Sequence, residues 1–180
     1  MPFSFKKLAI PEVILIDVPS FPDDRGYFFE SFKESEFISN GITTKFVQDN
    51  FSHSTYGVLR GLHYQKNPKA QTKLVITLRG EIFDVAVDIR KNSPTFGVWV
   101  GEILSENNHK LLYIPEGFAH GFCVLSEEAD VLYKVNNEYS PENEKGIIWN
   151  DPQINVQWPV DVPILHEKDS ALPILKNTDF

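Results

Sequence analysis

Cysteine is almost absent from this chain, whose 180 residues include only Cys123. No disulfide bond can form within the chain, which favours a reducing compartment, because stable disulfides mark exported proteins. A signal peptide is not indicated either, because Pro11 and Glu12 stand where its apolar core would run. The apolar run at 13–18 contains Asp17 and is too short to cross a bilayer. We therefore expect a cytoplasmic protein.

Basic residues are also few, with 17 Lys and Arg against 25 Asp and Glu and a formal net charge of -8. This balance argues against nucleic-acid binding, which needs a basic surface, so we expect no nucleic-acid and no membrane partner. It does not exclude an anionic small ligand, since a few placed cations make a cleft locally positive. The sequence has no internal repeat, low-complexity tract or linker, and residues 1–180 are predicted to form a single domain.

Aromatic residues are plentiful, with 14 Phe, 6 Tyr and 3 Trp, and they favour β-strands. The 12 prolines and 10 glycines are scattered between short apolar runs, as expected for many short strands joined by turns. A short helix is predicted at 33–39, stopped by Gly41, with others only in the final stretch. The strands predicted outside motifs lie at 13–18, 27–32, 98–104, 110–114, 121–125 and 130–135. The pattern favours an all-β sandwich or barrel, without choosing between a jelly roll, an immunoglobulin-like sandwich and a lipocalin-like barrel.

Two consecutive apolar runs, 71–78 and 81–89, are predicted to form either a β-hairpin or a tight corner around Gly80. Side chains alternate in the second run, so its valines share one face while Asp84 and Asp88 share the other. We interpret these two acids as facing solvent. If Asp84 instead points into a barrel, it needs a hydrogen-bond partner there, near an active site.

Two short motifs resemble those of metal-binding cupins. The first normally reads G-x5-H-x-H-x3/4-E; here Gly57 and His63 match it, Gln65 replaces the second histidine, and no acid follows. The second, P-x-G-x2-H, is retained from Pro115 to His120. The resemblance implies a cupin-type jelly roll, in which two antiparallel sheets pack together, with a few short helices.

The metal site of such a cupin is not retained. A catalytic metal normally has at least three good protein ligands and an open position. His63 and His120 supply two ligands, and the amide oxygen of Gln65 is a poor replacement for a third. We therefore expect neither a metal nor another cofactor, which leaves both histidines for acid–base chemistry or hydrogen bonding.

Longer segments resemble the dTDP-4-dehydrorhamnose 3,5-epimerase family, in the same order and over nearly the whole chain. These segments are 23–30, 47–52, 57–65, 71–75, 79–90, 113–122 and 146–152. The resemblance implies a cofactor-independent isomerase of dTDP-L-rhamnose biosynthesis. Its substrate would be dTDP-4-dehydro-6-deoxy-D-glucose, epimerised at C3 and C5 to dTDP-4-dehydro-L-rhamnose. It also implies a homodimer whose protomers exchange strands near the site.

Such a reaction needs a base on one face of the sugar ring and a proton donor on the other. It also needs a stabilising group at the C4 oxygen, because loss of a C3 or C5 hydrogen gives an enolate. His63 is the candidate base, since histidine titrates near neutrality. The family resemblance implies Tyr133 as the proton donor and Lys73 as the cation near C4. It likewise implies that Asp169 holds the tautomer of His63 and favours its imidazolium form.

Substrate binding requires groups for a diphosphate and a thymine. Arg25 and Arg60 suit phosphate oxygens, since guanidinium groups bind them in a bidentate manner. The resemblance implies that Tyr139 stacks on the thymine, and its exchanged strands allow Arg25 and Glu30 to serve the partner's pocket. The other expected substrate-binding residues are Phe28, Gln48, Asn50, His120, Glu144 and Lys168.

Each of these residues also has a simpler interpretation. Lys73 opens an apolar strand and by itself is typical of an exposed edge charge. Tyr133 lies on an apolar strand and by default is a core tyrosine, and Asp169 by default is a solvated loop acid. The histidines outside any motif, interpreted as surface or packing residues, are His53, His109 and His166.

Other functions stay open on the sequence. A mono-epimerase, or an epimerase of another nucleotide sugar, differs in donor position and pocket shape, which residue patterns do not reveal. A keto-sugar 3,4-isomerase is a similar relative, but a tyrosine donor opposite the histidine favours epimerisation at two centres. A metal-dependent cupin oxygenase is disfavoured by Gln65. A non-catalytic sugar- or nucleotide-binding cupin would bind its ligand without exchanging protons.

Overall fold

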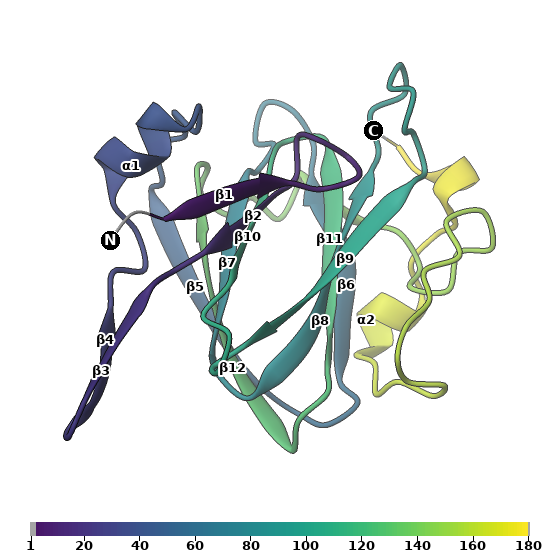
Figure 1. The fold of residues 1–180 in the computed structure, drawn as a ribbon. Coiled ribbons are helices and arrows are strands. Elements are labelled where there is room, and N and C mark those ends of the chain that lie inside the picture. Colours follow the sequence, from purple (N-terminus) through teal and green to yellow (C-terminus); the bar gives the residue numbers. More distant parts are fainter. Residues whose placement is uncertain (1–2, 180) are drawn as a thin grey trace.

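The computed structural model describes residues 3–179, and its regular secondary structure is mainly short strands (Figure 1). The strands are β1 (Ser4–Lys7), β2 (Ile14–Asp17), β3 (Ser20–Asp23), β4 (Gly26–Phe29), β5 (Gln48–Thr55), β6 (Leu59–Gln65), β7 (Lys73–Arg79), β8 (Glu81–Asp88), β9 (Trp99–Ser105), β10 (Leu111–Ile114), β11 (Phe118–Val124), β12 (Glu128–Val135) and β13 (Glu144–Gly146). The helical elements are α1 (Glu34–Ser39), α2 (Glu167–Ser170) and the 3-10 turn η1 (Leu175–Asn177).

Two antiparallel sheets face each other across the core. The first has the strand order β1-β2-β10-β7-β12-β5 and the second β13-β6-β11-β8-β9. The hairpin β3–β4 belongs to neither sheet and projects away from both (Figure 1). The predicted all-β architecture of two packed antiparallel sheets with a few short helices is therefore confirmed.

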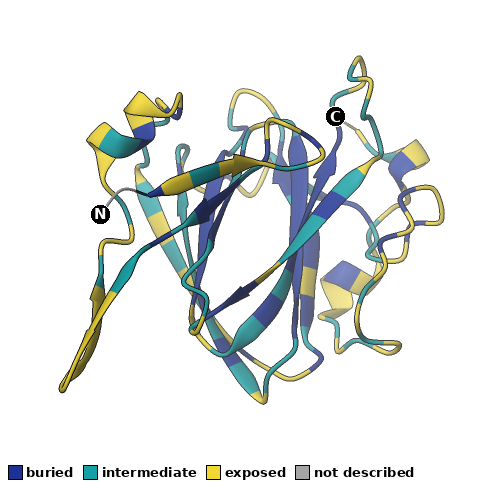
Figure 2. Cartoon of the chain, in the orientation of Figure 1, coloured by how far each residue is buried: buried dark blue, intermediate teal, exposed yellow. Residues whose placement is uncertain are grey.

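The main apolar core lies between the sheets, where the strands are dark blue in Figure 2. Alternation along each strand sends every second side chain into this space. Buried core residues include Leu15, Val75 and Leu112 from the first sheet and Ala86, Leu104 and Phe122 from the second. Both sheets are also partly covered outside. Ile154 and Val156 of the C-terminal segment cluster with the outward side chains of β8, and Phe37 of α1 clusters with Leu74.

The run from β7 to β8 is a corner between the two sheets and not a hairpin. β7 pairs with β10 and β12, whereas β8 pairs with β9 and β11. The chain turns at Gly80, which has a φ of +75°. A Cβ atom there would lie 2.0 Å from the carbonyl oxygen of Glu128, so no other residue fits this turn. The tight corner is thus confirmed and the hairpin alternative is wrong.

The acids of β8 do not face solvent, contrary to their first interpretation, because Asp84 and Asp88 are both fully buried. Alternating valines suggested one buried face, but the core covers one side of β8 and the C-terminal segment covers the other. Each acid accordingly has a polar partner. Asp88 pairs with Arg90, and Asp84 pairs with His120 as its alternative interpretation required.

The predicted short helix at 33–39 is confirmed as α1, followed by Gly41 with a φ of +85°. The predicted strand at 27–32 ends at Phe29, and the one predicted to begin at Gly121 begins at Phe118. Within residues 3–179, no helix combines the length and the apolar character needed to cross a membrane.

Candidate active site

A cavity of about 460 Å³ opens between the two sheets and the C-terminal segment. Ten of the predicted site residues line it: Asn50, Arg60, His63, Lys73, His120, Tyr133, Tyr139, Glu144, Lys168 and Asp169. A second cavity of about 340 Å³, lined in part by Ile89 and Phe118, contains none of the predicted site residues. The fold therefore gathers side chains from distant segments in one cleft.

His63 and Asp169 form a hydrogen-bonded pair at this cavity. The Nε2 atom of His63 on β6 lies 2.8 Å from Oδ1 of Asp169 on α2, although 106 positions separate the residues. The backbone N–H of Gly61 donates to Oδ2 of Asp169 at 3.3 Å. Burial opposes ionisation of Asp169, but the bonds from His63 and Gly61 outweigh it and hold the pKa of this carboxyl below its usual value. The ionised carboxylate fixes a hydrogen on Nε2 of His63 and leaves the lone pair on Nδ1.

A second histidine–acid pair lies beside the first. His120 on β11 is directly opposite His63 on β6, so both side chains point to the same face of the sheet. The Nε2 atom of His120 lies 2.7 Å from Oδ1 of Asp84 on β8. Burial lowers the pKa of His120, the nearby Lys73 lowers it further, and Asp84 opposes the shift. His120 is therefore neutral at neutral pH.

Lys73 is buried at the start of β7, between strands β10 and β12, so its interpretation as an exposed edge charge is wrong. Its Nζ atom donates to the carbonyl oxygen of His63 at 3.3 Å and lies 3.4 Å from Nδ1 of His120. Burial lowers the pKa of Lys73 to about 8, against the attraction of Asp84 and Glu144. The ammonium form still predominates at neutral pH.

Tyr133 on β12 lines the cavity from the sheet opposite His63. Its ring lies 6.0 Å from Nζ of Lys73 and 6.5 Å from the ring of His120. Burial raises the pKa of Tyr133, and Arg60 only partly offsets this. The hydroxyl therefore stays protonated at neutral pH and is available as a donor.

A polar cluster occupies the more exposed end of the cavity. The hydroxyl of Tyr139 donates to Oε2 of Glu144 at 2.7 Å, and Nζ of Lys168 lies 2.5 Å from the same oxygen. Gln48 accepts from the backbone N–H of Tyr139 at 3.0 Å and donates to Asn50 at 2.7 Å. Gln48 is not itself a lining residue, yet it holds two that are. The ring of Tyr139 stays exposed, so an aromatic surface faces solvent here.

The family model described as dTDP-4-dehydrorhamnose 3,5-epimerase matches residues 7–177. The chain belongs to this family. An enzyme of that name from Shigella flexneri is 58% identical over 164 residues, covering 91% of both chains. One from Pseudomonas aeruginosa is 56% identical over 165 residues, again covering 91% of both. The predicted 3,5-epimerase activity and its isomerase class are confirmed.

Solved structures agree with this assignment. The epimerase resembles one from Legionella pneumophila in complex with dTDP-4-keto-L-rhamnose, with 49% identity, a TM-score of 0.95 and coverage of 98% of this chain and 95% of that one. It also resembles one from Bacillus anthracis with TDP and pyrophosphate bound, with 47% identity, a TM-score of 0.93 and coverage of 96% and 99%. The predicted cupin-type jelly roll is thereby confirmed.

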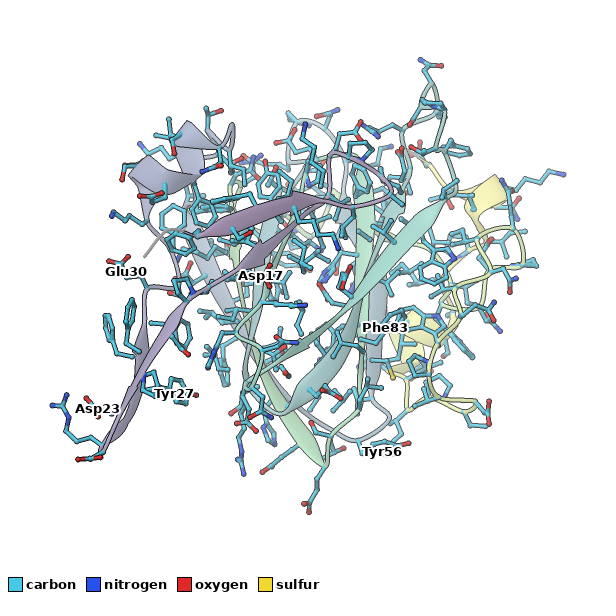
Figure 3. All side chains as sticks on the ribbon, in the orientation of Figure 1. Asp17, Asp23, Tyr27, Glu30, Tyr56 and Phe83 are labelled. Atoms are coloured by element: carbon cyan, nitrogen blue, oxygen red, sulfur yellow. The ribbon has the colours of Figure 1, made fainter. Side chains whose placement is uncertain are left out.

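Besides Gln48, which is bonded to lining residues, three predicted binding residues of the epimerase lie outside its own cavity. Arg25, Phe28 and Glu30 belong to the projecting β3–β4 segment, whose tip at Asp23 is labelled far from the sheets in Figure 3. Arg25 has a side chain that is 89% exposed and pairs only with its neighbour Asp23 among described residues. The fold of one chain thus does not bring these three residues to the other ten.

Asp84 is not among the predicted site residues, although a paired position near the site is the alternative that the sequence offers for it. Its signal was its position in the alternation, on the same face as Ala86, which lies in the core between the sheets. An acid at such an inward position has to be paired, and in an antiparallel sheet its partners lie on the adjacent strands. Among residues 3–179, no three His, Cys, Asp or Glu side chains are grouped so as to hold a metal ion.

Proposed function

We propose that the epimerase inverts C3 and C5 of dTDP-4-dehydro-6-deoxy-D-glucose by metal-free proton transfer between His63 and Tyr133. The product would be dTDP-4-dehydro-L-rhamnose. The observation that carries this proposal is the placement of a carboxylate-paired histidine and a protonated tyrosine on facing sheets of one cavity. A sugar ring held between the sheets meets the base on one face and the donor on the other.

The first half of each inversion breaks a C–H bond beside the ketone. The lone pair of His63 takes the proton, and the electrons of the C–H bond move to the C4 oxygen to form an enolate. Asp169 stabilises the resulting imidazolium, since its carboxylate is 2.8 Å from the ring. Lys73 is the buried cation that can face the enolate oxygen.

The second half delivers a proton to the opposite face of the same carbon. Tyr133 gives its hydroxyl proton, the enolate collapses to the ketone, and the carbon is inverted. The phenolate and the imidazolium then return to their starting forms by exchange with solvent through the open end of the cavity. Repeating the cycle at the second carbon completes the 3,5-epimerisation.

The exposed end of the cavity suits the nucleotide. Arg60 and Lys168 supply positive charge for the diphosphate, and Tyr139 offers its exposed ring to the thymine. Asn50 can hydrogen-bond sugar or phosphate oxygens. Both ring nitrogens of His120 are already paired with Asp84 and Lys73, so its predicted contact with substrate is made through Lys73. Relatives carry such ligands, since the Legionella structure holds dTDP-4-keto-L-rhamnose and the Bacillus structure holds TDP.

The projecting hairpin supports a homodimer in which each protomer completes the site of the other. Three large apolar side chains of the hairpin, Phe21, Tyr27 and Phe28, are 37%, 55% and 66% exposed, which is unusual unless a partner covers them. Arg25 and Glu30 on the same segment would then enter the partner's cavity. This arrangement explains why these predicted residues lie outside their own site.

Complementation between inactive variants tests the shared site. Arg25→Ala and His63→Ala protomers are mixed, dissociated and reassociated, and the dimer is verified by light scattering. A heterodimer with exchanged hairpins has one complete site, so an equimolar mixture should regain about a quarter of wild-type activity. Recovery of none would show that Arg25 serves its own chain.

The reaction itself is tested by proton NMR of the substrate in deuterated water with chelator-treated protein. We expect deuterium at both C3 and C5, and none with His63→Ala. Tyr133→Phe should still exchange hydrogen through His63 while forming little inverted product. Exchange at one carbon alone would indicate a mono-epimerase, such as the 3'-monoepimerase of Streptomyces bikiniensis, 30% identical with a TM-score of 0.88 over 94% of this chain and 86% of that one. Binding without exchange would indicate a non-catalytic cupin.

A further inference from the structure

Asp84 is an acid in an otherwise apolar part of the barrel. Its side chain is fully buried on β8, on the face that also carries Ile82 and Ala86 of the main core. Its Oδ1 atom meets His120, while its Oδ2 atom has no hydrogen-bond partner among described residues. An ionised carboxylate in such a place is costly unless a nearby positive charge compensates it.

The compensating charge is Lys73, reached through His120. Asp84 accepts the hydrogen on Nε2 of His120, which leaves the lone pair of that ring on Nδ1. Nζ of Lys73 lies 3.4 Å from this Nδ1, so it is the donor of the contact. The three residues belong to strands β8, β11 and β7 and thus connect the two sheets.

The same chain of contacts limits where the ammonium group of Lys73 points. One N–H is directed to Nδ1 of His120, and a second donates to the carbonyl oxygen of His63 at 3.3 Å. The third N–H is left for a ligand in the cavity that Lys73 lines. A reversed tautomer of His120 would place N–H against N–H and push the ammonium away from this position.

We propose that Asp84 is a positioning residue for the epimerisation, which fixes the tautomer of His120 and so aims the Lys73 ammonium at the C4 oxygen of the sugar. This inference rests on the proposed function, because it requires Lys73 to face the enolate. Asp84 touches no substrate and acts only through His120 and Lys73.

The charges around Lys73 agree with this role. Burial lowers the pKa of Lys73 to about 8, and Asp84 is the largest opposing influence, followed by Glu144. The other titratable groups near it are the imidazole of His120 and the ring of Tyr133 at 6.0 Å, and the imidazole of His63 lines the same cavity. Without the charge of Asp84 the pKa of Lys73 falls further, and less of the ammonium survives at neutral pH.

The test compares Asp84→Asn with wild type in kcat and KM across a wide pH range. The protonated form of Lys73 is the active one, so activity is lost as pH rises through its pKa. Asp84→Asn should therefore move the alkaline limb of kcat to lower pH and reduce kcat at neutral pH by about ten-fold or more. KM and the affinity for dTDP, measured by calorimetry, should change little because the nucleotide binds at the other end of the cavity.

Asp88→Asn is the matched control, because Asp88 is also a fully buried acid on the same face of β8 but pairs with Arg90 outside the cavity. It should keep the pH profile of kcat unchanged. An alkaline limb that stays in place in Asp84→Asn, or that moves equally in both variants, overturns the proposal. If the wild type itself exchanges neither C3 nor C5 hydrogen, it is the proposed function that fails.

If Asp84→Asn does not fold, the tautomer of His120 can be measured in the wild-type protein instead. The imidazole ¹⁵N spectrum, with His120 assigned through His120→Gln, distinguishes the two ring nitrogens. We expect hydrogen on Nε2 and a lone pair on Nδ1 of His120. Hydrogen on Nδ1 would overturn the proposal, because Lys73 could not then donate to it.

Discussion

The two histidine–acid pairs of the barrel have nearly the same geometry and opposite surroundings. In both, Nε2 of the histidine meets Oδ1 of an aspartate, at 2.8 Å for His63 and 2.7 Å for His120. The side chain of His63 is 30% exposed, whereas that of His120 is 6% exposed. His63 can therefore pass a proton to a ligand and then to solvent, while His120 is confined to one protonation state. Both histidines are paired with an acid, so it is the difference in exposure that suits His63 to act as a base and His120 to hold Lys73 in place.

The acids of the two pairs also reach them differently. Asp84 lies on the strand next to His120, diagonally across from it, since the direct partner of His120 is Ala86. Asp169 comes from α2, outside both sheets, and is held by the backbone N–H of Gly61. The Asp84–His120 pair is thus formed within one sheet. The Asp169–His63 pair forms only when α2, from the C-terminal part of the chain, packs beside β6.

Removing His63, the more exposed histidine of the two pairs, should have the largest effect. We expect His63→Ala to lower kcat by about 10³-fold, because no other side chain takes its place as general base. Deuterium exchange at C3 and C5 should fall together, with the melting temperature nearly unchanged because the side chain is partly exposed. A folded His63→Ala protein that still exchanges both hydrogens would assign the base elsewhere.

Removing the acid of the same pair should have a smaller effect. Asp169→Asn keeps the size of the side chain but loses the charge that stabilises the imidazolium, so we expect kcat to fall by about 10²-fold. Steady-state kinetics measures the fall in kcat, and calorimetry with dTDP checks that the variant still binds the nucleotide. Equal kcat values in Asp169→Asn and wild type would mean that His63 needs no carboxylate.

Replacing His120 should mainly alter how the stability of the protein depends on pH. Its effect on kcat should be smaller than that of replacing His63 or Asp169. Burial places the pKa of His120 below its usual value, so the unfolded chain binds its proton more readily. The wild type should lose stability as pH falls through the usual pKa of histidine, until the folded pKa is reached. In His120→Gln this part of the decline should be missing, while kcat drops by about ten-fold as Lys73 loses its acceptor. Thermal melts at a series of pH values provide the measurement, and an unchanged pH dependence would contradict the assignment.

Some of these features can be predicted from the sequence alone and others cannot. His63 and His120 belong to two local sequence motifs, and each motif forms part of a strand. Both histidines could therefore be predicted as site residues from the sequence. The run through Gly80 was compatible with a hairpin or a corner, because a glycine turn serves both and only the pairing of β7 and β8 with other strands decides. The solvent-facing interpretation of Asp84 is wrong because the distant C-terminal segment covers the valine face of β8, while the face that carries Asp84 points to the core between the sheets.

The predicted binding residues divide in the same way. Asn50 and Tyr139 were expected from separate segments, and the fold brings both to the cavity. Arg25 and Glu30 lie on a segment that the fold projects outward, and neither lines the cavity of its own chain. Local sequence patterns thus identify candidate residues and the face of the strand on which they lie. They do not reveal contacts with segments that are distant in the sequence.

Asp88→Asn should have the smallest effect on catalysis and shows what a buried acid does away from the cavity. Asp88 accepts from Arg90, Ser93 and Thr95, and although burial opposes ionisation, these bonds lower its pKa to about 2. Because the folded pKa lies below the unfolded value, its stabilisation is complete above the unfolded pKa and is lost as pH falls toward the folded one. We expect the variant to lose about 2 kcal/mol of unfolding free energy at neutral pH, with kcat unchanged. Denaturant unfolding at several pH values should show the difference shrinking in acid. A fall in kcat that matches that of Asp84→Asn would mean that any buried charge on β8 supports the site, and the distinction between the two acids would disappear.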